Sequence, residues 1–352
     1  HSLRCDFNGS LIKGNRLAKG DFNSLVRGVD FHVIWHVELF QLLRGLVEVG
    51  TLSAENKGAA GWILFETRRN LLDFLYVRFA HRNQQHKKAK EQGVCSLVIS
   101  FSVTPQTFFG RPQARISSFR EKHLLLQSLG VDKHLLIRFN KAFSEISAND
   151  FINNVLIKKI NMSHCFVGDD FRFGSGREGD FSMLEKASIE KNFTVQKIGG
   201  VSVNGRRVSS TEIRKALTAG DFKSAEAFLG RPFSISGKVA NGDQLGRTIG
   251  FPTANISIKR RLSPVLGVYS VLIEHNSKTY TGVCNIGKRP TLGGTKTLLE
   301  VFIFDFNQEI YGDPVKVVFK QKCRDEIKFE SFEELKKQIQ KDVEKSRLFF
   351  QS

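Results

Sequence analysis

The chain has few of the features that mark secreted, zinc-binding or membrane-spanning proteins. Its five cysteines are odd in number, lie far apart and form no CxxC pair, which argues against a disulfide framework and a zinc site and fits a reducing cytoplasm. No apolar run approaches the roughly 20 residues that a membrane-spanning helix needs. Charges at Arg4, Asp6 and Lys13 interrupt the N-terminus, so no signal peptide is expected. We therefore predict a soluble, cytoplasmic protein.

Acidic residues are outnumbered, with 35 Asp and Glu against 53 Lys and Arg and a formal net charge of +18. This charge favours anionic small molecules such as nucleotides and permits nonspecific contact with nucleic acid. The basic residues are scattered, however, and the only compact cluster in the second half is Lys259-Arg260-Arg261. His32 and His36 lie four apart without a third ligand nearby, which disfavours a metal site. We expect small-molecule substrates, no membrane or specific nucleic-acid partner, and a monomer or weak homo-oligomer.

At 352 residues the chain is long enough for two domains. From about residue 90 short apolar runs, typical of buried parallel strands, alternate with segments of helical spacing. We expect strands at 94–101, 131–139, 164–167 and 193–198 and helices at 117–129 and 150–160. This alternation predicts a layered α/β domain with a parallel sheet, whose ligands bind beyond the carboxyl ends of its strands.

A pair of short helices is expected next, as a connection between domains. Ser209 and Glu212 fit a capping box, and that helix should stop at Gly220. Asp221 should cap the second helix, which ends at Gly230.

After residue 232 the hydrophobic pattern changes to period two, with strands expected at 233–239, 268–273, 279–284, 298–304 and 315–319. This predicts an antiparallel barrel or sandwich. A closing amphipathic helix should begin at the capping box Ser331-x-x-Glu334. Its buried stripe is predicted to be Phe332, Leu335, Ile339 and Val343.

The most informative stretch runs from 237 to 255 and reads GKVANGDQLGRTIGFPTAN. Gly242, Gly246 and Gly250 recur every four residues, which suits a loop whose backbone N–H groups approach a phosphate closely. Thr253 and Asn255 stand two apart, so in an extended segment they point to the same side. Their oxygens suit a Mg²⁺–phosphate group. The plainer alternative is a Gly/Pro-rich surface turn between two strands.

Several short motifs occur in one order along the chain. They are Cys165–Gly174 (CFVGDDFRFG), Gly176–Asp180, Arg207–Arg214 (RVSSTEIR), the 237–255 stretch, Gly267–Tyr269, Asn285–Thr291, Leu299–Val301, Tyr311–Gly312 and Arg324-x-Glu326 before Phe329. Together they resemble the prokaryotic bifunctional riboflavin kinase/FMN adenylyltransferase family, also called FAD synthetase. The likeness extends from about Ala89 to the C-terminus.

The resemblance implies a Rossmann-like nucleotidyltransferase domain followed by a small antiparallel riboflavin-kinase β-barrel with a C-terminal helix. It implies Mg²⁺, with ATP, riboflavin, FMN and FAD as substrates or products. The family's general base is the Glu of the Leu299-Glu300-Val301 motif, and Glu300 lies in an otherwise apolar run where a carboxylate is costly to bury. The alternative is an outward-facing strand Glu. Thr253 and Asn255 would hold Mg²⁺ and ATP phosphates. Arg324 and Glu326 would lie on the flavin side, or form a surface ion pair.

In the first domain the resemblance implies a nucleotide-binding role for Ser209, Ser210, Thr211 and Arg214. A helix N-terminus favours anions, and Arg214 can add a charge-assisted contact one turn later. Asp170 and Phe171 would lie in the flavin pocket, whereas Phe173 is expected in the core.

One family feature is missing. The family opens its first domain with a strand and a GxFDGxHxGH loop whose histidines hold ATP phosphates. Only fragments of that loop, Asp73-Phe74 and His81, are found before residue 87. Two explanations compete: loss of FMN adenylyltransferase activity, or a corrupted first part such as a frameshift in the source sequence. A third possibility is a fully bifunctional enzyme whose histidines come from elsewhere.

The predicted organisation has four parts: residues 1–86 unassigned, 87–205 adenylyltransferase-like, 206–230 a helical connection with the SSTEIR motif, and 231–352 the kinase barrel. The leading prediction is a riboflavin kinase that makes FMN. The alternative from another class is a noncatalytic flavin- or nucleotide-binding regulator with a basic RNA-binding surface.

Overall fold

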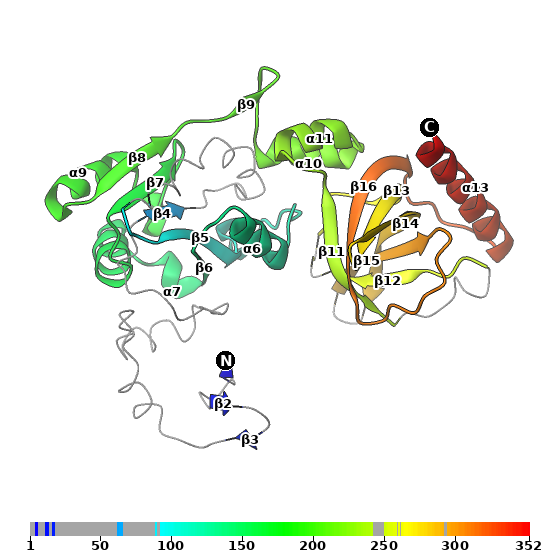
Figure 1. The fold of residues 1–352 in the computed structure, drawn as a ribbon. Helices are drawn as coiled ribbons and strands as arrows, with labels where there is room; N and C mark the ends of the chain where they lie inside the picture. The colour runs from blue at the N-terminus through cyan, green and yellow to red at the C-terminus, as the bar shows by residue number, and fades with distance from the viewer. Residues whose placement is uncertain are drawn as a thin grey trace.

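The computed structural model describes residues 92–352 apart from 242–249, 259, 261, 292–293 and the side chains of 288–291 and 294–296. Before residue 92 it describes Ala89 and the backbone of strands β1 (Arg4–Cys5), β2 (Leu11–Lys13), β3 (Arg16–Leu17) and β4 (Trp62–Phe65). His32, His36, Asp73, Phe74 and His81, which the sequence analysis singled out, lie outside the described residues. An α/β part and a β-barrel are separated along the chain by two short helices (Figure 1).

The α/β part is built on a five-stranded sheet of order β6-β5-β4-β7-β8, in which every pairing is parallel. The parallel α/β prediction is therefore confirmed. Its strands are β5 (Ser96–Val103), β6 (Lys133–Arg138), β7 (His164–Gly168) and β8 (Thr194–Ile198). The central strand β4 comes from the stretch in which the sequence indicated no element. Its four residues are too few to display a period.

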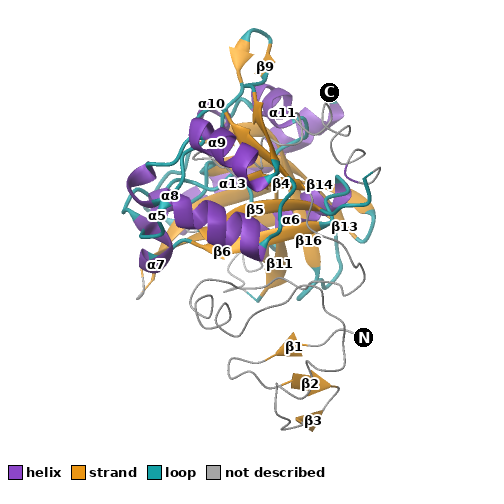
Figure 2. Ribbon diagram, turned by 90° about the vertical axis from the view of Figure 1, so that its left-hand side faces the viewer, coloured by secondary structure: helices purple, strands orange, loops and turns teal. Residues whose placement is uncertain are grey.

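Helices cover both faces of this sheet (Figure 2). On one face Leu126 of α6 packs against Val98. On the other, a larger cluster joins the sheet to α9 and to the helical stretch 148–159. The helices of this part are α5 (Pro105–Phe108), α6 (Phe119–Ser128), α7 (Lys141–Ser144), α8 (Ala148–Asp150) with its continuation Phe151–Lys159, and α9 (Phe181–Lys191). The continuation has the wider i+5 spacing, as in the bond from Ile160 N to Val155 O.

A hairpin and two helices follow the sheet. The hairpin consists of β9 (Ser202–Val203) and β10 (Arg206–Arg207), turning at Asn204 and Gly205, which both have positive φ. The helices are α10 (Ser210–Ala219) and α11 (Phe222–Leu229). Both helices end at a left-handed glycine, Gly220 and Gly230, as the sequence predicts.

The second part is a closed antiparallel barrel of order β11-β12-β15-β14-β13-β16. The predicted barrel is confirmed, and β12 adds a strand to the predicted set. Its strands are β11 (Ser234–Ala240), β12 (Ala254–Ser257), β13 (Gly267–His275), β14 (Lys278–Thr291), β15 (Gly294–Ile303) and β16 (Pro314–Arg324). Closure leaves no free edge among the six described strands of the barrel.

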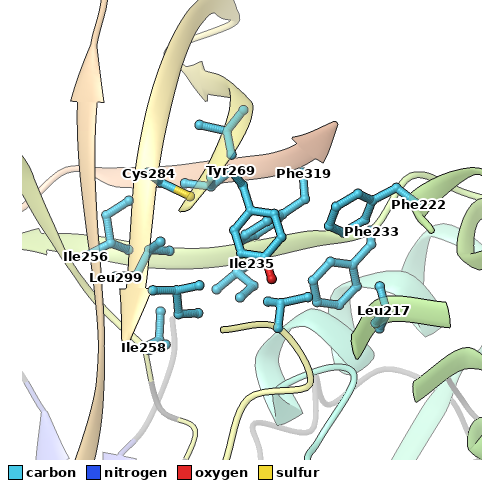
Figure 3. Close-up of a cluster of buried hydrophobic side chains, with 14 of the residues drawn as sticks. Leu217, Phe222, Phe233, Ile235, Ile256, Ile258, Tyr269, Cys284, Leu299 and Phe319 are labelled. Carbon is cyan, nitrogen blue, oxygen red and sulfur yellow. The ribbon is translucent and has the colours of Figure 1, made fainter. Parts of the chain in front are cut away.

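One apolar cluster fills the barrel and continues into the two linking helices (Figure 3). Phe222 of α11 packs edge-on against Tyr269, with ring centroids 5.6 Å apart, and stacks on Phe319 at 5.9 Å. The hydroxyl of the fully buried Tyr269 donates to Leu266 O (2.7 Å). The helical connection is therefore part of the barrel core.

The C-terminal helix α13 (Phe332–Gln351) packs on the outside of the barrel. Its Val343 and Ile339 join an outer cluster with Phe304 and Val268. Phe332, predicted to be part of the buried stripe, is instead 49% exposed. Phe332 is the first residue of the helix, and the contacts with the barrel are made further along, by Ile339 and Val343.

The half-buried His134 makes the stability of the first domain sensitive to acid. Its Nε2 lies 2.6 Å from the Ser100 hydroxyl on the neighbouring strand. Burial, and then the charges of Lys122 and His123, lower the pKa of His134 to about 4. The unfolded chain, with an ordinary pKa near 6.5, binds this proton first. The stabilising contribution is therefore complete above pH 6.5 and is lost as the pH falls through 4.

We predict that the wild-type chain loses about 1–2 kcal/mol more unfolding free energy than His134→Gln between pH 7 and pH 5. Gln retains a hydrogen-bonding side chain but does not titrate. Urea unfolding of both proteins at the two pH values measures the difference. Parallel losses in the two proteins would contradict the assignment to His134.

Candidate functional site

Three polar side chains form a row across neighbouring strands of the barrel. Glu300 on β15 lies directly opposite Asn255 on β12 and Asn285 on β14. Directly opposed residues in an antiparallel pair project to the same face, with Cβ atoms about 5 Å apart. Leu299 and Val301, which flank Glu300, are fully buried in the barrel core. The row therefore lies on the outer face of the barrel wall.

An aromatic contact holds the GFPTAN segment beside this row. Phe251 meets Phe302 edge to face at 5.4 Å, and Phe302 stands two residues beyond Glu300 on the same face. Thr253 follows, exposed, ahead of the half-buried Asn255. Gly250 has φ +87°, a conformation that suits glycine. Gly242 and Gly246 lie outside the described residues.

The Glu326 carboxylate covers the backbone of β14 at Gly287. A Cβ built on Gly287 would overlap Glu326 Oε1, so this position admits no side chain while Glu326 stays in place. Gly287 is two residues from Asn285 and therefore on the face of the row. Two carboxylates, Glu300 and Glu326, thus border the same patch of the outer wall.

Arg324 is engaged within the protein. Its guanidinium pairs with Asp342 of α13 at 2.8 Å, and Asp342 is only 5% exposed. A further bond goes to Asp325 O (2.9 Å). Arg324 thus forms an ion pair with the buried Asp342 and not the surface pair with Glu326 that the sequence offered as the alternative. This pair attaches α13 to the end of β16.

The α/β part has a pocket of about 360 Å³ at the carboxyl ends of β7 and β8. This is where an open parallel sheet binds ligands. Asp170 and Phe171, predicted as flavin-site residues, both line it. Phe173 is buried and packs against Phe151 and Phe171, as the core prediction requires. The remaining lining residues are Asp169, Arg172, Arg177, Asp180, Phe181, Ser182 and Lys197.

Charged side chains that line this pocket contact one another or an aromatic ring. Arg172 bonds to Asp180 at 2.9 Å. The hydrogen bond from Met183 N, followed by the one from Arg172, holds the pKa of Asp180 below its usual range. Lys197 lies over the ring of Phe181 at 4.2 Å. The mixture of cations and an aromatic floor suits a planar ligand that carries a negative group.

The hydroxyls of the SSTEIR motif have three different environments. Ser209 caps α10 by accepting from Glu212 N (3.2 Å). Ser210 is 2% exposed and Thr211 is exposed. The Glu212 carboxylate accepts from Arg206 and Lys215, so the structure shows the Ser209 half of the predicted capping box. Only Thr211 is therefore presented openly to solvent.

Two contacts connect the start of α10 and the strand before it to the rest of the first domain. Arg214 donates to Ala114 O (2.7 Å) and, within α10, to Ser210 O (3.2 Å). Arg207 pairs with Asp169, a pocket residue, at 2.9 Å. The pocket and the SSTEIR motif are thus physically connected.

Sequence reasoning missed the contribution of Asn285 and Gly287 to the barrel site and the Arg207–Asp169 pair. The motifs that contain Asn285 and Glu300 were recognised in the sequence. Only the strand register reveals that Asn285 stands opposite Glu300. No local signal in the sequence reports that register.

Comparisons with known proteins agree on both halves. Residues 82–212 match the FAD synthetase family model and residues 229–350 match the riboflavin kinase model. The bifunctional riboflavin kinase/FMN adenylyltransferase of Haemophilus influenzae is 43% identical over 269 residues, covering 76% of this chain and 87% of that protein. The protein of the same description from Pseudomonas fluorescens is 42% identical, covering 76% and 88%.

A crystal structure described as a macrolide-efflux protein from Streptococcus pneumoniae has a TM-score of 0.67 and 30% identity, covering 83% of this chain and 95% of that one. Within the part of the chain that the structure describes, every helix is too short or too polar to span a bilayer.

We predict that Gly287→Ala costs less than about 1 kcal/mol of unfolding free energy, because the new methyl group meets the end of a flexible, exposed Glu326 side chain. Gly282→Ala on the same strand is the matched control. Its Cβ would meet Phe302 O at 2.5 Å and Ile273 Cδ1 at 2.8 Å, so we expect a loss of about 1–3 kcal/mol. Urea unfolding compares the two, and equal losses would contradict the placement of Glu326.

Proposed function

Because this chain belongs to the bifunctional riboflavin kinase/FMN adenylyltransferase family, we propose that it transfers the γ-phosphate of ATP to the 5′-hydroxyl of riboflavin, with Glu300 as the general base. The observation that carries the assignment is the row Asn255, Glu300 and Asn285 on the outer wall of the barrel. The family relationship gives no support to the alternative of a noncatalytic RNA-binding regulator.

The proposed chemistry needs little beyond positioning and neutralisation of charge. Glu300 accepts the proton of the attacking hydroxyl, so the carboxylate must reach a ligand rather than the core. Its outward orientation on β15 keeps the carboxylate out of the core, within reach of a ligand. The same orientation belongs to the alternative of an outward-facing strand Glu, and the Glu300→Gln variant below separates the two. The amides of Asn255 and Asn285, on either side, can hold the carboxylate or the substrate hydroxyls in register.

The donors near this row suit Mg²⁺, which prefers hard oxygen ligands and retains several waters. Thr253 offers an exposed hydroxyl and Asn255 a half-buried amide oxygen. We propose that these two residues hold the metal, and that Gly242, Gly246 and Gly250 place backbone N–H groups around the phosphates. When bound, Mg²⁺ neutralises phosphate charge.

On the flavin side, Glu326 is the stronger candidate of the predicted pair. Its carboxylate lies over Gly287, beside the row, and is exposed. Arg324 is already held by Asp342, so we propose that it fixes the chain that carries Glu326.

The second proposed activity is adenylylation of FMN to FAD in the first domain. The pocket lined by Asp170 and Phe171 supports a flavin site there. Ser209, Ser210, Thr211 and Arg214 do not line the pocket, but the Arg207–Asp169 pair connects their helix start to it, which supports a nucleotide site beside it. The phosphate-binding histidines of the family remain unmatched before residue 87. We therefore propose that this step is impaired in the chain as written.

The kinase assignment predicts that the chain converts riboflavin and Mg-ATP to FMN, separated by chromatography. Glu300→Gln should lower kcat by roughly 10²–10⁴-fold with little change in riboflavin affinity, the usual effect of losing a general base. Thr253→Ala and Asn255→Ala should also weaken Mg-ATP binding. A folded wild-type protein that forms no FMN would contradict the kinase assignment. A near-normal kcat in Glu300→Gln would show that Glu300 is not the general base.

We expect FAD formation from FMN and ATP to be weak or absent. Phosphate clamps stabilise charge that develops in the transition state, so their loss lowers the rate more than flavin affinity. Pyrophosphate release with FMN as substrate measures the step, and flavin fluorescence measures binding separately. Robust Mg²⁺-dependent FAD synthesis would show that another early residue replaces the histidines.

A further inference from the structure

The carboxylate of Glu121 joins the first domain to the barrel. Glu121 belongs to the first turn of α6, where it accepts from Ser118 N (2.5 Å) as half of a capping box. The same carboxylate accepts from Ser236 N of β11 (2.7 Å) and from the guanidinium of Arg260. One carboxylate therefore completes the cap of α6. It also makes two contacts with residues more than a hundred positions away in the chain.

The two barrel contacts lie where β11 and β12 stop pairing. The last pair of that ladder is Lys238 with Ser257, so the N–H of Ser236, two residues further, has no β12 partner in it. Glu121 supplies the acceptor at that place. Arg260 follows the end of β12 by three residues, with the buried Ile258 between. The carboxylate therefore holds the adjacent ends of both strands.

Burial separates this contact from an ordinary surface ion pair. The side chain of Arg260 is 1% exposed and that of Glu121 is 13% exposed. A buried ion pair adds little net stability over a well-packed apolar pair, but it fixes geometry, because either charge left alone is strongly unfavourable. Next to it, Ile116 packs into the barrel cluster and Arg231 donates to the Ser117 hydroxyl (3.2 Å).

At their other ends, the two strands that Glu121 contacts lead into the proposed Mg-ATP segment. β11 ends at Ala240 and β12 begins at Ala254, and the stretch between them contains the three glycines and Thr253. Asn255 lies on β12 opposite Glu300. A shift of β12 relative to β11 would therefore move Thr253 and Asn255 away from the base.

We propose that Glu121, acting through Arg260 and Ser236, is a positioning residue for the kinase reaction. The first domain thereby sets the affinity of the barrel for Mg-ATP. This inference rests on the proposed function of Thr253 and Asn255 and adds a residue from the other domain to that site.

The test compares full-length variants by the total FMN and FAD formed from riboflavin at varied Mg-ATP and at varied riboflavin. Glu121→Gln keeps the acceptor for Ser236 but leaves Arg260 without its counter-charge. The double variant E121Q/R260M removes both charges and leaves none buried, so it stays testable if the single variant fails to fold. Ser117→Ala is the matched control, because it removes a hydrogen bond at the same interface that does not involve β11 or β12.

We expect E121Q/R260M to raise the KM for Mg-ATP about tenfold, with the KM for riboflavin within twofold of wild type. Ser117→Ala should change neither constant. Arg260→Lys keeps the charge opposite Glu121, so its KM for Mg-ATP should lie between those of wild type and E121Q/R260M. An E121Q/R260M protein with lower thermal stability but an unchanged KM for Mg-ATP would overturn the inference while leaving the kinase assignment intact. A wild-type protein that forms no FMN would overturn both.

Discussion

The arrangement of the barrel site depends on the antiparallel register of β12, β15 and β14. A slip of one residue in β15 would turn Glu300 into the core and bring Leu299 or Val301 to the surface. The core resists such a slip, because both flanking residues are fully buried among the residues that fill the barrel. Burial of the two flanking residues thus determines the outward direction of the Glu300 carboxylate.

Packing on both sides of the barrel wall supports this register. From inside, Phe222 and Leu217 of the linking helices complete the core around Tyr269 (Figure 3). From outside, α13 covers Phe304 and Val268. Arg347 of that helix pairs with Asp305 just beyond β15 (2.8 Å). The strand that bears Glu300 is therefore held at its end and on both faces.

Much of this architecture follows from local patterns in the sequence. Short apolar runs and capping residues predicted the parallel sheet, the helical pair and the barrel. β4 escaped prediction because a central strand of four residues depends on its neighbours β5 and β7 rather than on its own periodicity. Phe332 has the correct spacing for the helix stripe, but its position at the helix start leaves it exposed.

The site was predictable in its residue types but not in its partners. Glu300, Thr253 and Asn255 stand out as polar residues within apolar or glycine-rich segments. The placement of Asn285 beside Glu300, of Glu326 over Gly287 and of Glu121 against Arg260 depends on long-range pairing. Such contacts have no signature in a single sequence, because nothing local connects positions 139 residues apart.

The most direct measurement is a crystal structure of the full chain with riboflavin, ADP and Mn²⁺ as an anomalous scatterer in place of Mg²⁺. Our account predicts the metal peak at Thr253 and Asn255 on the outer wall of the barrel. It also places the ribityl 5′-hydroxyl within hydrogen-bond distance of Glu300. A flavin bound elsewhere on the barrel, with Glu300 contacting only solvent, would contradict the account.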